Sequence, residues 1–257
     1  MRKIVLLVGL FLCLFPAAHA QDAAGPEQAW EEANTLYING DYAGAAAAYE
    51  ALSAEGYVGG KLFYNLGNAY FKAGELGRAV LNYNKALKLV PNDRDAAYNL
   101  AVANGYVKDK IDAVPEFFLS RWIRAWRSSL DSNAWAARSL VLLAAALAGV
   151  LVFLLEERRG WRKAGFVAAV VFFVLFVFAV VFAAVEKKEF TEASEAVVMV
   201  QAASVKSAPE KGGSDLFIIH EGTKVDVLSS FDGWTEIMIA DGNKGWVPSD
   251  SVELITY

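Results

Sequence analysis

The chain has 257 residues, of which 56% are hydrophobic and 21% charged, and a formal net charge of −5. Both ends are acidic: residues 21–110 carry 11 acidic and 8 basic side chains, and residues 186–257 carry 13 and 6. This balance argues against nucleic acid, anionic lipid head groups and anionic cell-wall polymers as ligands of the two ends.

Residues 1–20 have the pattern of a secretory signal peptide. Arg2 and Lys3 begin the segment, Ile4–Phe15 is its apolar run, and Ala18-His19-Ala20 forms an A-x-A cleavage site. The alternative is an uncleaved membrane anchor. The only cysteine is Cys13, so cleavage would leave a chain without a disulfide or a thiol nucleophile.

An internal repeat with a period of 34 residues follows the signal. Gly40-Asp41-Tyr42 matches Gly74-Glu75-Leu76, and Tyr49 matches Tyr83. The period and pattern resemble the tetratricopeptide repeat (TPR) family, in which each unit is a helical hairpin. The resemblance implies an all-α array over residues 26–110. Its units are residues 26–59, residues 60–93 and a partial third unit at residues 94–110.

The TPR resemblance also implies a concave, peptide-binding groove lined by the first helix of each unit. In this groove the asparagines would bond a peptide backbone, and the aromatic rings would clamp its side chains. The alternative is that the aromatic rings only pack between helices. The family's groove positions fall on Asn34, Tyr37, Lys61, Tyr64, Asn68, Phe71 and Tyr98.

Residues 111–133 predict an amphipathic segment next to the membrane. Aromatic and aliphatic side chains recur at helical spacing around Trp122 and Trp126, with Arg121, Arg124 and Arg127 between them. A basic, tryptophan-bearing amphipathic helix is typical of the lipid head-group layer. The alternative is a helix that packs back onto the repeats.

Two apolar runs predict a transmembrane hairpin, with helices at residues 134–155 and 164–185 and a cytoplasmic turn at residues 156–163. About 20 apolar residues cross a hydrocarbon core of about 30 Å. With the export signal, this predicts a protein of the bacterial inner membrane whose two soluble domains face the periplasm. Arginines on the outer flanks oppose this orientation. The uncharged apolar stretches at residues 139–155 and 164–185 contain no ionisable residue, which argues against a channel or transporter.

Short β-type runs separated by Gly and Asp-Gly turns begin near residue 196 and predict a small all-β barrel at residues 197–257. Glu221-Gly222-Thr223, Gly233-Trp234-Thr235 and Gly245-Trp246-Val247-Pro248 resemble the bacterial SH3-like (SH3b) family. The resemblance implies a ligand surface at Trp234, Trp246 and Pro248, although both tryptophans could equally belong to the core. Some relatives bind cell-wall peptides. We expect the lone His220 to be structural.

The predicted fold class is a multidomain membrane protein with all-α TPR helical repeats, a two-helix transmembrane hairpin and a small all-β SH3-like barrel. We find no catalytic triad, metal-ligand cluster or phosphate loop in the sequence, and expect neither enzyme activity nor a cofactor. The order of segments resembles the BatE family of the Bacteroides aerotolerance operons.

The BatE resemblance implies protein partners among the other Bat membrane proteins. The leading hypothesis is an envelope adaptor that holds protein or peptide partners through its TPR and SH3b domains. A second hypothesis is a cell-wall sensor that binds peptidoglycan peptides. A third is a structural subunit whose hairpin packs against other membrane helices.

Overall fold

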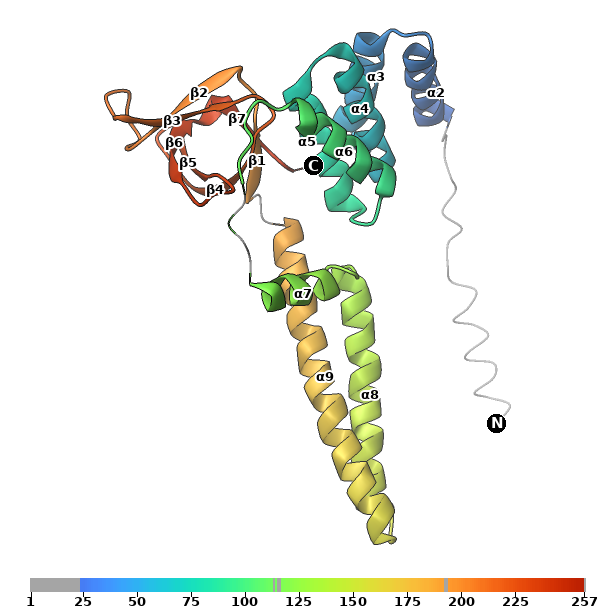
Figure 1. Ribbon diagram of the computed structural model, residues 1–257. Coiled ribbons are helices and arrows are strands. Elements are labelled where there is room, and N and C mark those ends of the chain that lie inside the picture. The colour runs from blue at the N-terminus through green and yellow to red at the C-terminus, as the bar shows by residue number, and fades with distance from the viewer. Residues whose placement is uncertain (1–23, 113, 115–116, 192–193, 257) are drawn as a thin grey trace. The chain divides into compact units, whose positions relative to one another are not determined.

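The computed structural model describes residues 24–112, 114, 117–191 and 194–256 (Figure 1). Residues up to 56 and residues from 57 onward form two compact units, and each is described by itself. The predicted signal peptide at residues 1–20 lies outside the described residues.

The first unit is a helical hairpin of α2 (Ala24–Ile38) and α3 (Tyr42–Ala54). Gly40 allows the tight turn between them because its φ of +83° is a left-handed conformation that glycine adopts without strain. Asp41 then caps α3: its carboxylate accepts a hydrogen bond from the Gly44 backbone N–H at 2.9 Å. Ala45 and Tyr49, four residues apart on one face of α3, are both buried.

The second unit begins with α4 (Gly60–Ala73), α5 (Leu76–Leu89) and α6 (Arg94–Tyr106). Gly74, with φ +87°, ends α4, and Pro91 follows α5 as the repeat pattern predicts. Gly67 lets α4 and α5 cross closely, since a Cβ atom there would lie 2.7 Å from the Tyr83 ring. The prediction of helical repeats is confirmed.

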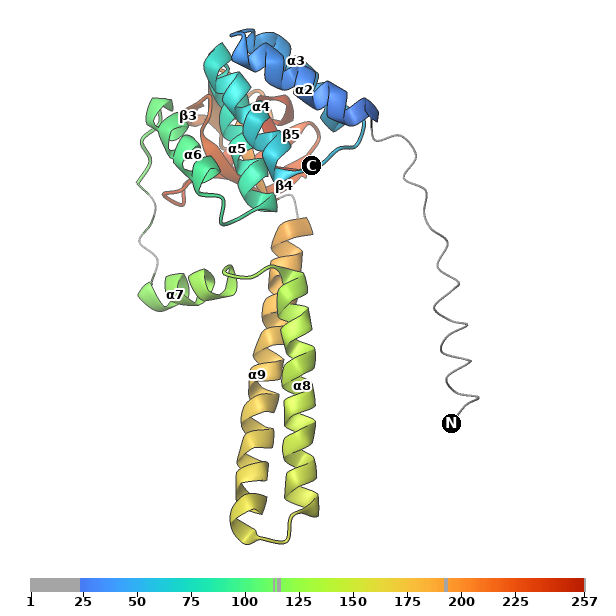
Figure 2. The same ribbon diagram turned by 90° about the vertical axis from the view of Figure 1, so that its right-hand side faces the viewer.

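Three helices follow: α7 (Phe118–Arg127), α8 (Ser132–Leu155) and α9 (Arg159–Thr191). Helices α8 and α9 lie side by side as an antiparallel hairpin, and α7 projects sideways from its open end (Figure 2). Only residues 156–158 connect α8 and α9, so the connection is shorter than the predicted turn at residues 156–163. The helices are longer than the apolar runs, because helical backbone hydrogen bonds continue through flanking charged residues that a hydropathy pattern leaves out.

The hairpin closes through two glycines. A Cβ atom on Gly149 would lie 2.7 Å from the Ala169 backbone nitrogen, and one on Gly165 would lie 2.8 Å from that of Phe153. Small residues at such a crossing let two helix backbones approach closely. Large side chains such as Leu140, by contrast, point away from the protein. Both helices are long enough and apolar enough to cross a membrane.

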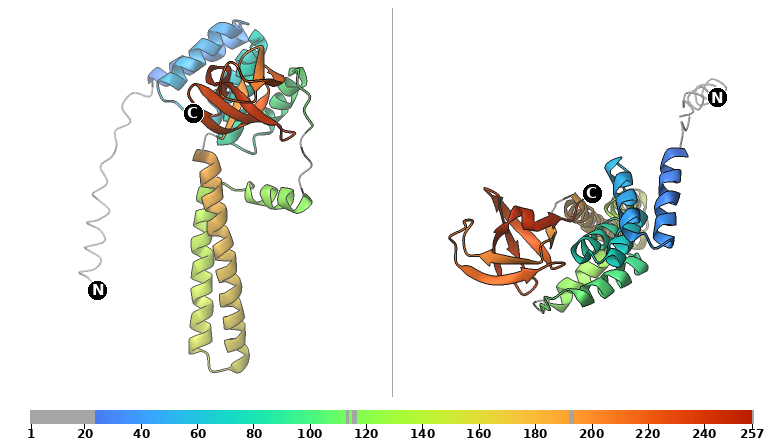
Figure 3. Two further views of the ribbon diagram at one scale, coloured as in Figure 1. Left: turned by 90° about the vertical axis from the view of Figure 1, so that its left-hand side faces the viewer. Right: turned by 90° about the horizontal axis from the view of Figure 1, so that it is seen from above.

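The C-terminal part is an antiparallel sheet, drawn in orange and red in Figure 3. Its strand order is β3-β2-β6-β5-β4-β1-β7. Its strands are β1 (Glu195–Val198), β2 (Ala202–Lys206), β3 (Asp215–His220), β4 (Lys224–Phe231), β5 (Trp234–Met238), β6 (Lys244–Pro248) and β7 (Val252–Leu254), with a 3-10 turn at Ser249–Ser251 before β7.

One apolar cluster forms the core of this sheet. Its buried side chains come from β1 through β6 and include Val198, Val205, Ile219, Ile237 and Val247. Because strands from nearly the whole sheet bury side chains in one cluster, the sheet must curl around it. Strands β2 and β7 have no clear β-type run in the sequence, because β2 is rich in small and polar residues and β7 has only three residues.

The sheet packs against α5 through polar contacts. The Gly77 backbone N–H donates to Glu221 Oε1 at 2.7 Å, and Lys88 Nζ donates to the Ile255 carbonyl oxygen at 3.2 Å. Glycine suits this close approach, since a Cβ atom at position 77 would lie 2.9 Å from Glu221 Cγ and 3.1 Å from the Val198 carbonyl oxygen. The second repeat and the sheet are therefore joined by contacts between residues that precede α8 and residues that follow α9.

Replacing Gly149 with leucine tests the hairpin packing. The added side chain would meet the α9 backbone, and such overpacking costs about 1–3 kcal/mol. We expect a lower thermal unfolding midpoint for the full chain in detergent micelles. Gly160→Leu is the matched control, because a Cβ atom there meets no atom within 4 Å. Equal midpoints for the two variants would contradict the described crossing.

Candidate functional site

Several of the predicted groove residues lie on α4 and α6, which contact each other within the second unit. Phe71 on α4 meets Tyr106 on α6 edge to face, with ring centroids 5.5 Å apart. Tyr64 and Asn68 on α4 are joined to α6 by Asn99. The amide nitrogen of Asn99 donates to Asn68 Oδ1 at 2.8 Å and lies 3.3 Å from the Tyr64 hydroxyl oxygen.

Two other predicted groove residues stay open to solvent. Tyr98 on α6 is 70% exposed, and Lys61 on α4 is also exposed. The structure therefore brings Tyr64, Asn68 and Phe71 together and leaves Tyr98 and Lys61 available at the surface. Asn99, which links the two helices, lies outside the family's groove positions and was missed from the sequence.

Asn68 also has a structural role, because it links α4 to α5. Its Oδ1 also accepts a hydrogen bond from the Tyr83 hydroxyl on α5 at 2.8 Å. The first unit contains the same pair: the Tyr49 hydroxyl donates to Asn34 Oδ1 at 2.6 Å. Both pairs join residues 15 apart and recur at the repeat period of 34, a spacing that points to a helix-to-helix link. Each asparagine oxygen is thus already used within its own repeat.

Tyr37, the remaining groove candidate, belongs to the first unit. Its ring lies edge to face with that of Tyr42, with centroids 5.3 Å apart. This contact spans the turn between α2 and α3, so Tyr37 packs between the two helices of the first unit.

The β-domain candidates Trp234, Trp246 and Pro248 lie on one face of the sheet. Trp234 is the register partner of Pro248 across β5 and β6, and Glu236 is that of Trp246. Side chains alternate between faces along a strand, and the core residues Ile237 and Val247 occupy the opposite face. All three candidates are half-buried and stand outside the core cluster. The structure thus brings them together on a partly exposed surface.

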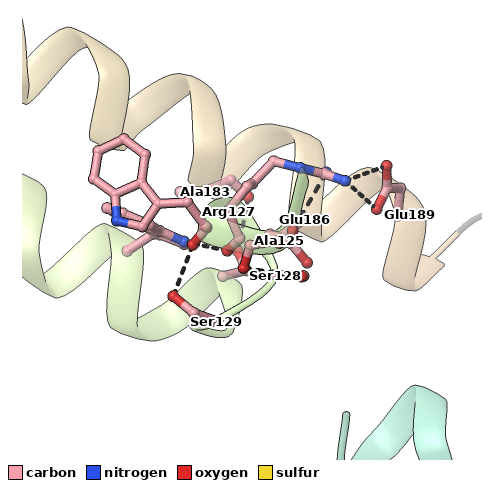
Figure 4. Close-up of polar contacts among 10 residues, drawn as sticks. Ala125, Arg127, Ser128, Ser129, Ala183, Glu186 and Glu189 are labelled. Atoms are coloured by element: carbon pink, nitrogen blue, oxygen red, sulfur yellow. Dashed lines mark hydrogen bonds and ion pairs between the residues drawn. The ribbon is translucent and has the colours of Figure 1, made fainter. Parts of the chain in front are cut away.

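A buried arginine fastens α7 to the hairpin (Figure 4). Both Glu189 carboxylate oxygens accept hydrogen bonds from Arg127 Nη2, at 2.7 and 2.8 Å, and Glu186 Oε1 lies 3.3 Å from Nη1. The Trp135 indole N–H donates to the Arg127 carbonyl oxygen at 2.8 Å. Because the Arg127 side chain is only 9% exposed, its two glutamate partners must offset the cost of burying its charge.

The helix held by this arginine presents an exposed aromatic surface. Trp122 is 65% exposed and stacks against Trp126, while Phe117 and Phe118 are also exposed. Trp126 in turn meets Trp135 and Phe182, which are buried at the junction with the hairpin. One side of α7 therefore packs on the hairpin and the other remains uncovered.

The segment after α6 is bound to the sheet by Asp109. Its carboxylate accepts hydrogen bonds from the His220 backbone N–H at 2.6 Å, from His220 Nδ1 at 2.7 Å and from the Thr223 hydroxyl at 2.7 Å. Lys108 Nζ lies 2.8 Å from His220 Nε2. Donation from Nδ1 to Asp109 and from Lys108 to Nε2 fits the neutral Nδ1–H tautomer. His220 is therefore a linking residue.

Burial alone would raise the pKa of Asp109. Hydrogen bonds from the Thr223 hydroxyl and from the His220 side chain and backbone outweigh burial and hold this pKa below its ordinary value of 3.8. The contact is thus built to bind the ionised carboxylate.

A family model described as "TPR repeat" matches residues 62–105 of the chain. No curated protein matches the chain. The matched segment covers most of α4, all of α5 and nearly all of α6. The chain therefore contains a TPR repeat, a structure that supports protein–protein interaction.

Asp109→Asn should weaken the contact between the linker and the sheet. Loss of hydrogen bonds to a charged acceptor costs about 1.5–3 kcal/mol, so we expect a lower unfolding free energy and faster hydrogen exchange at residues 107–112. Asp112→Asn, at an exposed position of the same segment, is the control.

The same variant has a defined pH dependence. Because folding lowers the pKa of Asp109, its stabilising effect is complete above about pH 4 and is lost as pH falls through the folded-state pKa. The difference between wild type and Asp109→Asn should therefore shrink in acid. A difference that grew with acidification would contradict the described contact.

Proposed function

We propose that this protein is a non-enzymatic, membrane-anchored adaptor that holds protein or peptide partners through its TPR groove and its β domain. The TPR match over residues 62–105 carries the proposal. The surface where α4 and α6 meet supports it, because Tyr98 and Lys61 remain open to a ligand beside the packed residues Tyr64 and Phe71. An exposed aromatic side chain on α6 and an exposed cation on α4 suit an extended peptide with an acidic group.

The anchoring part of the proposal rests on the hairpin. Two apolar helices whose large side chains face outward need an apolar environment, and a bilayer supplies one. The antiparallel arrangement puts the segments before α8 and after α9 on one side of that bilayer. With the signal pattern at residues 1–20, we propose that both soluble parts face the periplasm at the bacterial inner membrane.

Helix α7 suits the boundary of that bilayer. Its exposed tryptophan and phenylalanine rings, with Arg121 and Arg124 between them, have the character of an interfacial helix. The ion pairs of Arg127 with Glu186 and Glu189 tie this helix to the end of the hairpin, where a water–lipid boundary would lie.

The β domain supplies the second ligand surface in this proposal. Its strand pattern and the Trp234, Trp246 and Pro248 face fit an SH3-like (SH3b) module. An aromatic face outside the core also favours the alternative function, a sensor that binds cell-wall peptides. If the protein is an adaptor, its BatE-like order of segments favours other Bat membrane proteins as its partners.

Substitutions at the open groove positions test the adaptor function. Tyr98→Ala combined with Lys61→Glu should abolish co-purification of cross-linked partners from membranes, while the thermal unfolding midpoint stays unchanged because both side chains are exposed. Tyr57→Ala removes another exposed tyrosine as the matched control. Retention of every partner by the double variant would argue against the groove.

Spin labelling tests the placement of α7. We expect a nitroxide at Trp122→Cys, in a Cys13→Ser background, to be quenched more by oxygen than by a water-soluble nickel complex in lipid vesicles, because this face would lie in the head-group layer. A label at Tyr98→Cys should show the reverse preference. Adding Arg127→Ala should increase label mobility, since removing one partner of a buried ion pair costs about 3–5 kcal/mol. A nickel preference at position 122 would place α7 in water.

A further inference from the structure

An open cavity lies beside strand β3, and its lining includes none of the predicted TPR groove residues and none of Trp234, Trp246 and Pro248. Its volume is about 640 Å³. Its lining comes from β3, from the linker after α6 and from the turn between β5 and β6. The lining residues that matter here are Lys108, Lys110, Leu216, Ile218 and Lys244.

Strand β3 is an end strand of the sheet, and within the described residues it pairs only with β2. The backbone N–H of His220 donates to Asp109, so it faces away from β2. In an antiparallel pair the backbone groups of alternate residues face alternate sides. The N–H and C=O groups of Ile218 therefore also face away from β2, toward the linker side of the strand.

The linker holds the cavity open. Asp109 fixes one end of it to His220 and Thr223, and the Val114 backbone N–H donates to the Ala240 carbonyl oxygen at 3.1 Å. Ile111 between them packs against the apolar core of the sheet. Because the linker is fastened on both sides of Ile111, it cannot readily shift across the cavity to pair with β3.

The chemistry of the lining specifies a ligand. Leu216 and Ile218 are 51% and 58% exposed, an unusual exposure for neighbouring aliphatic side chains on an end strand. Three lysines, Lys108, Lys110 and Lys244, carry positive charge around them.

The two lining aspartates are already engaged. Asp109 accepts hydrogen bonds from His220 and Thr223, and Asp241 accepts two from Asn243, at 2.9 Å each. Lys108 contacts His220 and Lys110 donates to backbone carbonyl oxygens, partners that carry no negative charge. The cavity thus offers outward-facing strand backbone, apolar contact and a net positive charge.

We propose that β3 binds an extended segment of a partner protein, with alternating apolar and acidic side chains, by strand addition at this cavity. The segment would hydrogen-bond the edge-facing backbone of Ile218, lay its apolar side chains on Leu216 and Ile218, and direct its carboxylates toward the lysines. The bulge between Val205 and Lys206 in the β2–β3 register confines the pairing to the His220 end of the strand. This site deepens the proposed adaptor function by giving the β domain a defined class of ligand.

Direct peptide binding tests the site without involving the TPR groove. The probe is a fluorescein-labelled, acetylated Val-Glu-Val-Glu-Val-Glu amide, titrated with the purified full chain in detergent and followed by fluorescence anisotropy. We expect saturable binding that is at least 10-fold weaker for the Val-Lys-Val-Lys-Val-Lys peptide. N-methylation of alternate amides should abolish binding in one register and spare it in the other.

Matched variants locate the binding. Leu216→Asp and Ile218→Asp should each weaken binding at least 10-fold. Leu228→Asp should not, because Leu228 is a 46% exposed leucine at the bulge of β4, away from the cavity. In the wild-type chain, the peptide should slow hydrogen exchange of the Ile218 amide, a measurement that needs no variant.

Several results would overturn the proposal. These are absence of saturable binding, equal binding of the acidic and basic peptides, indifference to N-methylation in both registers, and equal effects of the Leu216 and Leu228 variants. A dimer of the full chain that Ile218→Asp dissociates would assign the edge to a second copy instead. None of these results bears on co-purification through Tyr98 and Lys61, so failure here and failure of the adaptor proposal can be told apart.

Discussion

The close crossing of α8 and α9 is the constraint on which the second unit depends. Glycine at positions 149 and 165 lets the two helix backbones approach closely. Because the helices are antiparallel, the chain leaves the hairpin at the same end at which it entered. Contacts between residues far apart in sequence follow from that return. Asp109 comes before the hairpin and His220 after it, and the same is true of Gly77 and Glu221. Without a tightly closed hairpin, the second repeat and the sheet would be joined only by a long chain.

The elements with strong local patterns could be predicted from the sequence. The 34-residue period identified the helical repeats, and the uncharged runs identified two long apolar helices, because both signals lie within a few turns of chain. Strand β2 gave no such signal, since Ala202, Ala203 and Ser204 are poor strand formers that are held by pairing with β3. The length of the connection between α8 and α9 was misjudged because hydropathy reports the environment of a helix and not its ends.

The candidate sites show the same division. Trp234 and Trp246 were recognised as a pair, but only the register of β5 against β6 shows that they share a face opposite the core. Asn68 was predicted to hydrogen-bond a bound peptide, whereas its Oδ1 accepts hydrogen bonds from Tyr83 and Asn99. The link from Asp109 to His220 left no trace in the sequence, because the two residues are 111 positions apart.

The docking of the sheet on α5 has a consequence for affinity. The predicted groove residues of the second unit lie on α4 and α6, whereas the sheet contacts α5. A ligand bound at α4 and α6 would therefore leave the ligand surface of the β domain unoccupied. Hydrogen bonds from Gly77 to Glu221 and from Lys88 to Ile255 link the repeat that carries one surface to the sheet that carries the other. A partner with two correctly spaced segments would therefore bind the second segment intramolecularly, at a high effective concentration. Two individually weak contacts would then give strong avidity, and a partner with the wrong spacing would gain none.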